Sequence, residues 1–274
     1  MAIPANRSKR SEMLRQRVIT GLIALAVLLV VLFVMPALAV KVVIAALILA
    51  GAWEWSGFLK LQSNGARLGY VGLMAALLAA VVGLADERIV EMIFEAALAW
   101  WLVALLWVFM FPTPIPRIAG WICGALVLIP TYVAIISLYT LQPSLLLFVL
   151  VIVWAADIGA YFAGKKFGRV KLAPNISPGK TWEGVIGGLF LAAVLVLLSS
   201  RWLETDLIVL LPFCLSVAII SIIGDLTVSM FKRDAGIKDS GRLFPGHGGV
   251  LDRIDSVTAA APLFALGVSW MGLT

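Results

Sequence analysis

The 274-residue chain is 62% hydrophobic and only 13% charged, against roughly 25% charged residues in an average soluble domain. With a mean hydropathy of +1.08, this composition excludes a water-soluble globular protein and predicts an all-α integral membrane protein, a polytopic helix bundle. The two cysteines, Cys123 and Cys214, fall inside apolar stretches. Their positions exclude a disulfide framework and favour a packing role.

Nine apolar stretches approach or exceed the roughly 17 to 25 residues that a helix needs to cross a bilayer. The first follows a basic segment without an obvious cleavage site, so we expect a retained helix rather than a signal peptide. The last is short and rich in Ala and Gly. The predicted spans are residues 18–35, 38–59, 69–85, 89–111, 118–139, 145–163, 182–202, 207–231 and 256–272.

Basic residues are distributed unevenly among the predicted loops. In a nine-helix arrangement with a cytoplasmic N-terminus, all of the 21 lysines and arginines lie on the inner side except Lys41, Arg88 and Arg201. This partition follows the positive-inside rule. The formal net charge of +6 is thus concentrated on one face, which attracts anionic membrane lipids and nucleotides. No nucleic-acid partner is expected.

Residues 1–140 are predicted to form N-terminal transmembrane helices that act as a scaffold with dimer or lipid contacts, and residues 141–274 to form the catalytic region. One exception in the scaffold is Glu54, which lies between Trp53 and Trp55. A carboxylate at membrane depth is costly unless it is near an interface, paired or protonated. Two roles stay open for it: an anchor at the inner interface, or the lining of a lipid or substrate cavity.

The sixth predicted helix carries Asp157 close to several small residues, among them Gly159 and Ala163. Small residues allow helices to approach closely in a membrane. We therefore expect a tightly packed helix whose carboxylate faces the interior of the bundle. The alternative is that Asp157 pairs with a neighbouring Lys or Arg for assembly.

The predicted cytoplasmic loop 164–184 contains Ser177, Lys180, Thr181 and Glu183 just before or at the start of the seventh helix. Helix N-termini present free N–H groups that favour anions. A hydroxyl at Ser177 or Thr181 is a candidate helix cap. Capping needs no cation, so Lys180 is better explained by binding of a phosphate.

The eighth helix places Asp225, Ser229 and Lys232 on one face, at helical spacing. Asp252 and Asp255 open the ninth helix, and the loop between the two helices is expected to bring them back to Asp225. Mg²⁺ prefers one or two carboxylates together with waters and substrate phosphates. The arrangement therefore favours a divalent-metal site.

The predicted cytoplasmic loop 232–255 is rich in glycine and in charge. Glycines such as Gly248 and Gly249 permit unusual backbone angles and a close approach of N–H groups to a phosphate. His247 is the only histidine in the chain. Three roles stay open for it: a general base, a phosphate ligand, or a residue that orders the loop.

The run from Ser229 to Asp255 resembles the motif of the phosphatidate cytidylyltransferase (CDP-diacylglycerol synthase) family. The segments around Asp157 and from Ser177 to Glu183 are also similar to that family. The matching positions of the motif are Ser229, Lys232, Arg233, Lys238, Asp239, Gly241, Pro245, His247, Gly248, Gly249, Asp252, Arg253 and Asp255.

The resemblance implies an enzyme of a bacterial-type inner membrane, with its active site on the cytoplasmic side. It would join CTP to phosphatidic acid, giving CDP-diacylglycerol and pyrophosphate, by in-line attack of the lipid phosphate on the α-phosphorus. The implied cofactor is Mg²⁺ on Asp225 and Asp252, with a second cation such as K⁺. A homodimer is implied too.

Two groups of residues are expected to carry this reaction. Catalytic roles fall to Asp225, Asp252, Lys232, Arg233, Lys238, Asp239, His247 and Asp255. Substrate binding falls to Asp157, Ser177, Lys180, Thr181, Glu183, Ser229, Gly248, Gly249 and Arg253.

Two alternative functions remain, a CTP-dependent lipid kinase and an anionic-solute transporter. A transporter should show broken helices in two related halves, whereas this chain concentrates its polar residues in the last third.

Overall fold

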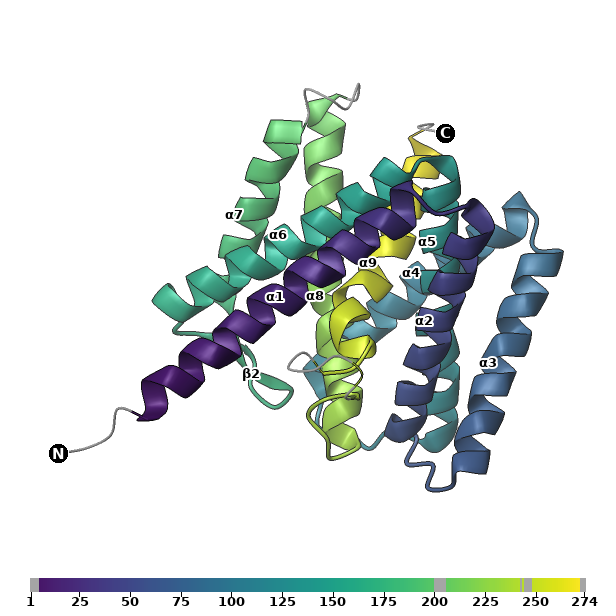
Figure 1. Ribbon diagram of the computed structural model, residues 1–274, viewed down its shortest axis with the longest axis horizontal. Helices are drawn as coiled ribbons and strands as arrows, with labels where there is room; N and C mark the ends of the chain where they lie inside the picture. Colours follow the sequence, from purple (N-terminus) through teal and green to yellow (C-terminus); the bar gives the residue numbers. More distant parts are fainter. Residues whose placement is uncertain (1–4, 200–205, 242, 244–247, 272–274) are drawn as a thin grey trace.

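The computed structural model describes the backbone of residues 5–199, 206–241, 243 and 248–271, and the side chains of this set from residue 19 onward. These residues form nine α-helices and one two-stranded sheet (Figure 1). The elements are α1 (Ala5–Phe33), α2 (Ala37–Phe58), α3 (Asn64–Leu84), α4 (Glu87–Met110), α5 (Arg117–Leu141), α6 (Pro143–Phe167), β1 (Lys171–Ala173), β2 (Ser177–Thr181), α7 (Trp182–Ser199), α8 (Leu207–Asp234) and α9 (Leu251–Trp270).

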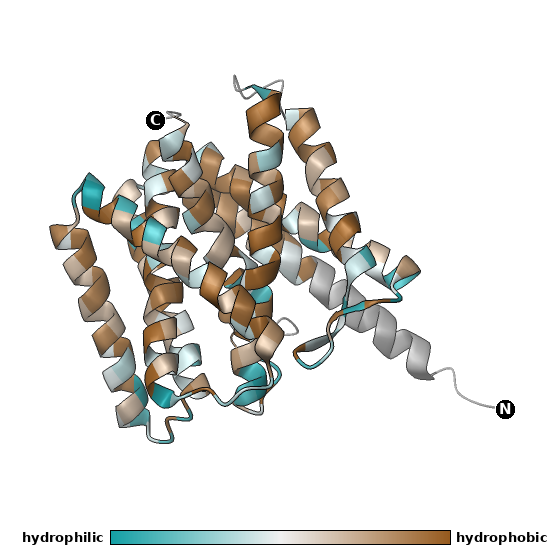
Figure 2. Ribbon diagram, turned by 180° about the vertical axis from the view of Figure 1, so that it is seen from behind, coloured by the Kyte–Doolittle hydropathy of each residue, from teal (hydrophilic) through white to brown (hydrophobic). Residues whose placement is uncertain are grey.

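Seven helices of the described chain, α2 to α8, are long and apolar enough to cross a membrane. Their outer surfaces are largely hydrophobic (Figure 2), as expected of helices that face lipid rather than water. The prediction of an all-α polytopic membrane protein is therefore confirmed. The apolar part of α1, Ile19–Phe33, is shorter, and α9 is not among the seven, so the count of nine spans stays a prediction.

Helix α9 lies inside the bundle and packs against helices from both halves of the chain, including α5 and α8. Its buried surface is built largely from small side chains, such as Ala259 and Ala260. Because its neighbours are protein and not lipid, close packing matters more for α9 than strong hydrophobicity. Pro262 removes one ladder donor, and the Thr131 hydroxyl of α5 lies 3.3 Å from the freed carbonyl oxygen of Thr258.

Helices α6 and α7 pack backbone against backbone over part of their length. A Cβ atom at Gly159 would overlap the carbonyl oxygen of Gly187, and one at Gly187 would overlap the side chain of Ala163. Small residues on both helices thus allow the close approach that interhelical packing in membranes uses. The predicted tight packing of the Asp157 helix is confirmed, whereas Asp157 itself is exposed and lines a cavity rather than being buried in the bundle.

The segment between α6 and α7 forms a short antiparallel hairpin, in which Lys171 pairs with Thr181 and Ala173 with Ser177. The sequence pattern predicted a polar loop here and gave no sign of either strand. Strand β1 has only three residues, too few to show an alternating pattern.

Three connections meet at one end of the bundle: the turn from α2 to α3, the hairpin, and the segment from α8 to α9 (Figure 1). An ion pair of 3.2 Å joins Lys60 after α2 to Asp234 at the end of α8. Arg233 Nε donates to the carbonyl oxygen of Ile176 in the hairpin, at 2.9 Å. These contacts hold the three connections around the C-terminal end of α8 and the N-terminal end of α9.

Candidate functional site

The first part of the site is built on α8. Asp225 Oδ1 accepts a hydrogen bond of 3.1 Å from the Ser229 hydroxyl, as the spacing of four residues along a helix predicts. Its other oxygen pairs with the ammonium group of Lys180, which comes from β2. The hairpin thus delivers a cation to a carboxylate on the helix.

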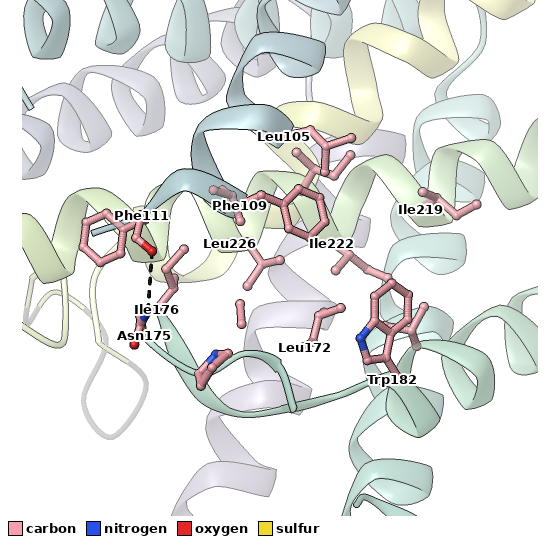
Figure 3. A pocket seen from close by; sticks show the side chains of 15 residues that line it. Leu105, Phe109, Phe111, Leu172, Asn175, Ile176, Trp182, Ile219, Ile222 and Leu226 are labelled. Carbon is pink, nitrogen blue, oxygen red and sulfur yellow. Dashed lines mark hydrogen bonds between the residues drawn. The ribbon is translucent and has the colours of Figure 1, made fainter. Parts of the chain in front are cut away.

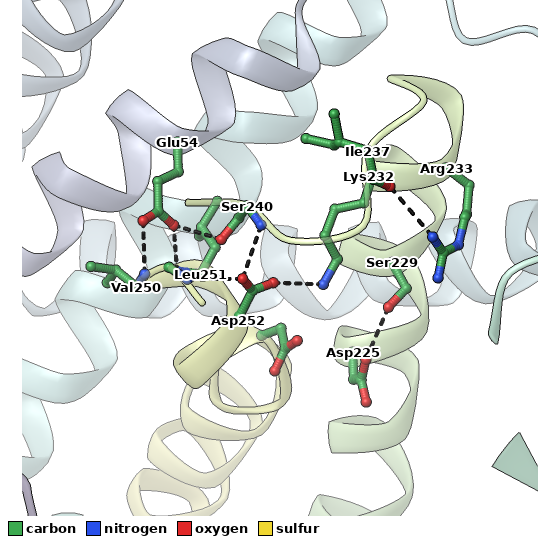
Figure 4. A network of polar contacts seen from close by, with 12 residues as sticks. Glu54, Asp225, Ser229, Lys232, Arg233, Ile237, Ser240, Val250, Leu251 and Asp252 are labelled. Atoms are coloured by element: carbon green, nitrogen blue, oxygen red, sulfur yellow. Dashed lines mark hydrogen bonds and ion pairs between the residues drawn. The ribbon is translucent and has the colours of Figure 1, made fainter. Parts of the chain in front are cut away.

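The second part joins α8 to α9. Lys232 Nζ donates to Asp252 Oδ1 at 2.8 Å (Figure 4), and only 10% and 8% of the two side chains are exposed. The prediction that the segment between these helices returns Asp252 to the α8 cluster is confirmed. Lys232 therefore stands between the two predicted metal ligands, bonded to Asp252 and close enough to Asp225 to interact with its charge.

The segment before α9 wraps around the second oxygen of Asp252. The backbone N–H groups of Ser240 and Gly249 both donate to Oδ2, each at 2.9 Å. Gly248 adopts a φ of 84° and lies directly against this carboxylate, where a side chain would be strained and would clash. Burial alone raises the pKa of Asp252, but the bonds from Lys232 and the two amides hold this pKa below its ordinary value.

Further charges surround Asp225. Asp157 of α6 and Asp255 of α9 both lie close enough to interact with it. Arg253 is exposed and acts on Asp157 through its positive charge. The structure therefore gathers four of the predicted acids, from three helices, around two lysines.

Three other residues, predicted to bind substrate, belong to the hairpin or to the start of α7, where two of them make hydrogen bonds that support the fold. Thr181 Oγ1 accepts a hydrogen bond of 3.1 Å from the N–H of Gly184, so Thr181 is the cap of α7. Glu183 accepts from the N–H of Val170, ahead of β1. Ser177 begins β2. The substrate-binding roles proposed for these three side chains stay predictions.

Arg233 stabilises two loop segments by donating hydrogen bonds to their backbone carbonyl oxygens. Besides Ile176, it donates to the carbonyl oxygen of Ile237 at 3.4 Å. The end of α8 is closed by Gly236 with a φ of 73°, and the N–H of Ile237 bonds back to the carbonyl of Lys232, the pattern of a Schellman cap. This cap turns the chain away from α8.

Lys238 and Asp239 lie beyond that cap, apart from the Asp225 cluster. They are exposed and line a separate pocket of about 860 Å³ together with Trp53 and Arg67. His247 falls outside the described residues, so its three possible roles stay open.

Glu54 is a site residue that comes from the first half of the chain. It is 8% exposed and accepts hydrogen bonds from Ser240 Oγ and from the N–H groups of Val250 and Leu251 (Figure 4). It also lines the pocket of about 860 Å³ to which Lys238 belongs. Of the two roles left open for it, the lining of a cavity is thus supported, and the anchor at the inner interface stays a prediction. The signal in the sequence was a lone carboxylate in an apolar helix.

Two cavities lie side by side near the site. One, of about 500 Å³, includes Asp157, Lys180 and Asp225 among its lining residues. The other, of about 330 Å³, has no charged side chain in its lining and lies between the hairpin, α4, α7 and α8 (Figure 3). Both are lined by Leu172, Val185 and Ile222, so a cavity with charged side chains and one without them share a wall.

A divalent cation needs oxygen ligands, and two aspartates of the site could provide them. Within the described ranges, no three His, Cys, Asp or Glu side chains are gathered as a metal cluster. Asp225 and Asp252 are each paired with a lysine ammonium group, so both carboxylates already face positive charge. Two such carboxylates fit Mg²⁺ in the mode that it prefers, with substrate phosphates and waters as the remaining ligands.

Fold and site together define a class, a polytopic membrane enzyme whose lysines and aspartates suit phosphate chemistry. The comparisons with known proteins make this specific: the profile of the cytidylyltransferase family matches residues 15–271. The chain belongs to this family, as the resemblance of its 229–255 run predicted.

Relatives with assigned names are similar over most of the chain. A phosphatidate cytidylyltransferase of Pseudomonas aeruginosa is 42% identical over 262 residues, which cover 92% of this chain and 96% of the relative. The protein of the same name from Haemophilus influenzae is 39% identical over 92% of this chain and 98% of its own length. The protein of that name from a Synechocystis strain is 52% identical over 114 residues, 40% of this chain and 38% of its own.

Proposed function

We propose that this protein transfers CMP from CTP to phosphatidic acid, releasing pyrophosphate and forming CDP-diacylglycerol for phospholipid synthesis. The observation that carries the proposal is the pair of Lys–Asp contacts, Lys180 with Asp225 and Lys232 with Asp252, at the end of a bundle that belongs to the cytidylyltransferase family. The names of the two relatives that match most of the chain agree with it.

The chemistry asks for positioning and charge neutralisation more than for proton transfer. A phosphate oxygen of the lipid, already deprotonated at neutral pH, attacks the α-phosphorus of CTP, and the bond to the β-phosphate breaks. Lys180 and Lys232 stabilise the charge on the two phosphate groups as they come together. Arg253 and Ser229 lie beside them, where they assist in holding the phosphates.

Asp225 and Asp252 would hold Mg²⁺, which, with a second cation such as K⁺, would neutralise the attacking and leaving phosphates. The two lysines would then contact the substrate phosphates instead of the carboxylates. Asp157 and Asp255 would orient the two lysines.

The paired cavities support an amphipathic substrate. The polar cavity would take the phosphate of phosphatidic acid, beside Lys180, and the apolar cavity under the hairpin would take part of an acyl chain. Because Ile222 and Val185 line both spaces, the two cavities adjoin, as the head group and acyl chain of one lipid molecule would require. A water-soluble anion has no use for the apolar space, which disfavours a transporter of small solutes.

We further propose nine membrane spans with a cytoplasmic N-terminus, in a bacterial-type inner membrane, and a homodimer. The supporting observation is the charge distribution: the basic residues of the described loops lie mainly at the end where the hairpin and the α8–α9 segment meet (Figure 1). By the positive-inside rule, this end faces the cytoplasm, where CTP is available.

The reaction is tested with purified protein in detergent and CTP labelled in the cytidine. We expect a chloroform-soluble product that requires both phosphatidic acid and Mg²⁺, together with release of pyrophosphate. Asp252→Asn should lower the rate by about 10²-fold or more, as loss of a group that organises the transition state does. Release of CDP with a phosphorylated lipid would instead indicate a CTP-dependent kinase, and no product with any lipid would contradict both.

A further inference from the structure

Glu54 is a buried carboxylate whose known partners are all hydrogen-bond donors from one short segment. Oε1 accepts from the N–H of Val250 at 2.8 Å, and Oε2 accepts from the N–H of Leu251 at 2.8 Å and from Ser240 Oγ at 2.7 Å. None of the three ion pairs found among the described residues includes it. Hydrogen bonds are therefore the direct polar contacts that stabilise this buried carboxylate.

These donors adjoin those that hold Asp252. Three consecutive amides are divided between two carboxylates: Gly249 donates to Asp252, whereas Val250 and Leu251 donate to Glu54. Ser240 is divided in the same way, because its N–H bonds to Asp252 and its hydroxyl bonds to Glu54. The two acids therefore hold the same loop from opposite sides.

Two glycines of the loop are explained by this contact. A Cβ atom at Gly241 or at Gly249 would overlap the Glu54 carboxylate. Both positions need glycine because the backbone passes directly over the acid. Glu54 comes from α2, 186 residues before Ser240, so the contact also ties the first part of the chain to the α8–α9 segment.

We propose that Glu54 is a positioning residue for Asp252. Its carboxylate accepts hydrogen bonds from the N–H groups of Val250 and Leu251 and from the Ser240 hydroxyl. Without Glu54, these donors would lack an acceptor beside the Asp252 carboxylate. Asp252 Oδ1 is then left to face Lys232 and the substrate. This inference rests on the proposed function, because the role of Asp252 in the reaction is taken from it.

The direct test is Glu54→Gln, which keeps the size of the side chain but replaces one acceptor oxygen with an NH₂ group. At least one of the two backbone donors then meets another donor. Glu95→Gln is the matched control, because Glu95 is an exposed carboxylate on α4. Ser240→Ala is a second variant, which removes one bond to Glu54 and leaves the backbone N–H of Ser240 on Asp252.

Two readouts separate positioning from general loss of structure. We expect Glu54→Gln to lower kcat by about 10- to 100-fold, as a small displacement of a reacting group does, and to raise the Mg²⁺ concentration for half-maximal activity. Hydrogen–deuterium exchange should become faster in the peptide that covers residues 248–255. Ser240→Ala should change both readouts in the same direction but less, and Glu95→Gln should change neither.

The outcomes are distinct. Unchanged Mg²⁺ dependence and unchanged exchange in Glu54→Gln, or a loss of activity that only follows the folded fraction, would overturn the inference. If the wild-type protein made no product, the proposed function would fail, and the exchange measurement alone would decide whether Glu54 holds the loop.

Discussion

The helices up to residue 141 and those after it are stabilised by different kinds of contact. In α1 to α5 the described contacts are mainly apolar and aromatic, such as the edge-to-face contact of Tyr70 with Trp121. In the later part, two ion pairs and a divided set of amides fix the ends of α8 and α9. Glu54 nevertheless reaches from the first part into the second, so a helical scaffold also contributes to the order of a polar site.

The largest expected difference between the two parts comes from their lysines. Lys232→Met removes the buried partner of Asp252 and a cation of the site, so we expect activity to fall by about 10²- to 10³-fold. Lys60→Met breaks a pair whose lysine side chain is 53% exposed, and such surface pairs contribute about 1 kcal/mol or less. Cytidylyltransferase activity in detergent is measured for both variants, and Lys60→Met should lower it far less. A rate within tenfold of wild type for Lys232→Met would contradict the placement of Lys232 in the site.

The second comparison concerns helix packing. Gly187→Ala places a methyl group against Ala163, and overpacking of this kind costs about 1 to 3 kcal/mol. Gly72→Ala on α3 meets nothing within 4 Å and should be neutral or slightly stabilising, because Ala favours helix more than Gly does. Thermal unfolding in detergent should therefore show a lower midpoint only for Gly187→Ala. Equal midpoints would mean that α6 and α7 separate without cost.

The smallest expected effect concerns the apolar cavity. Ile222→Phe adds bulk where the two cavities share a wall, so we expect KM for a long-chain phosphatidic acid to rise by about tenfold or less, with KM for CTP unchanged. Leu102→Phe is the control, because Leu102 is exposed on the outer surface of α4. A rise in KM for CTP instead would place the nucleotide, and not the lipid, in this space.

The parts of the fold that follow from local sequence were predictable. Apolar length alone located the helices, since each segment of a membrane helix satisfies its own backbone. Spacing of four residues predicted the contact of Ser229 with Asp225. The return of Asp252 to α8 followed from the single connection that joins these two consecutive helices.

The rest depends on contacts that no local pattern encodes. The partner of Glu54 lies nearly two hundred residues away, and nothing near Glu54 in the sequence identifies it. The pairing of Lys180 with Asp225 depends on a hairpin too short to have a periodic signal. Lys238 belongs to the same motif as Lys232, but it lines a pocket away from Asp225. The reason is that the cap at Gly236 turns the chain between the two lysines.

The enclosed position of α9 has a consequence for how the protein is made. A helix that is not among the apolar seven gains little from lipid on its own, so we expect the translocon to retain it until α5 and α8 are in place to receive it. Asp252 then joins Asp225 only after the rest of the bundle has assembled. The polar site would therefore be completed by the helix that depends most on its protein neighbours.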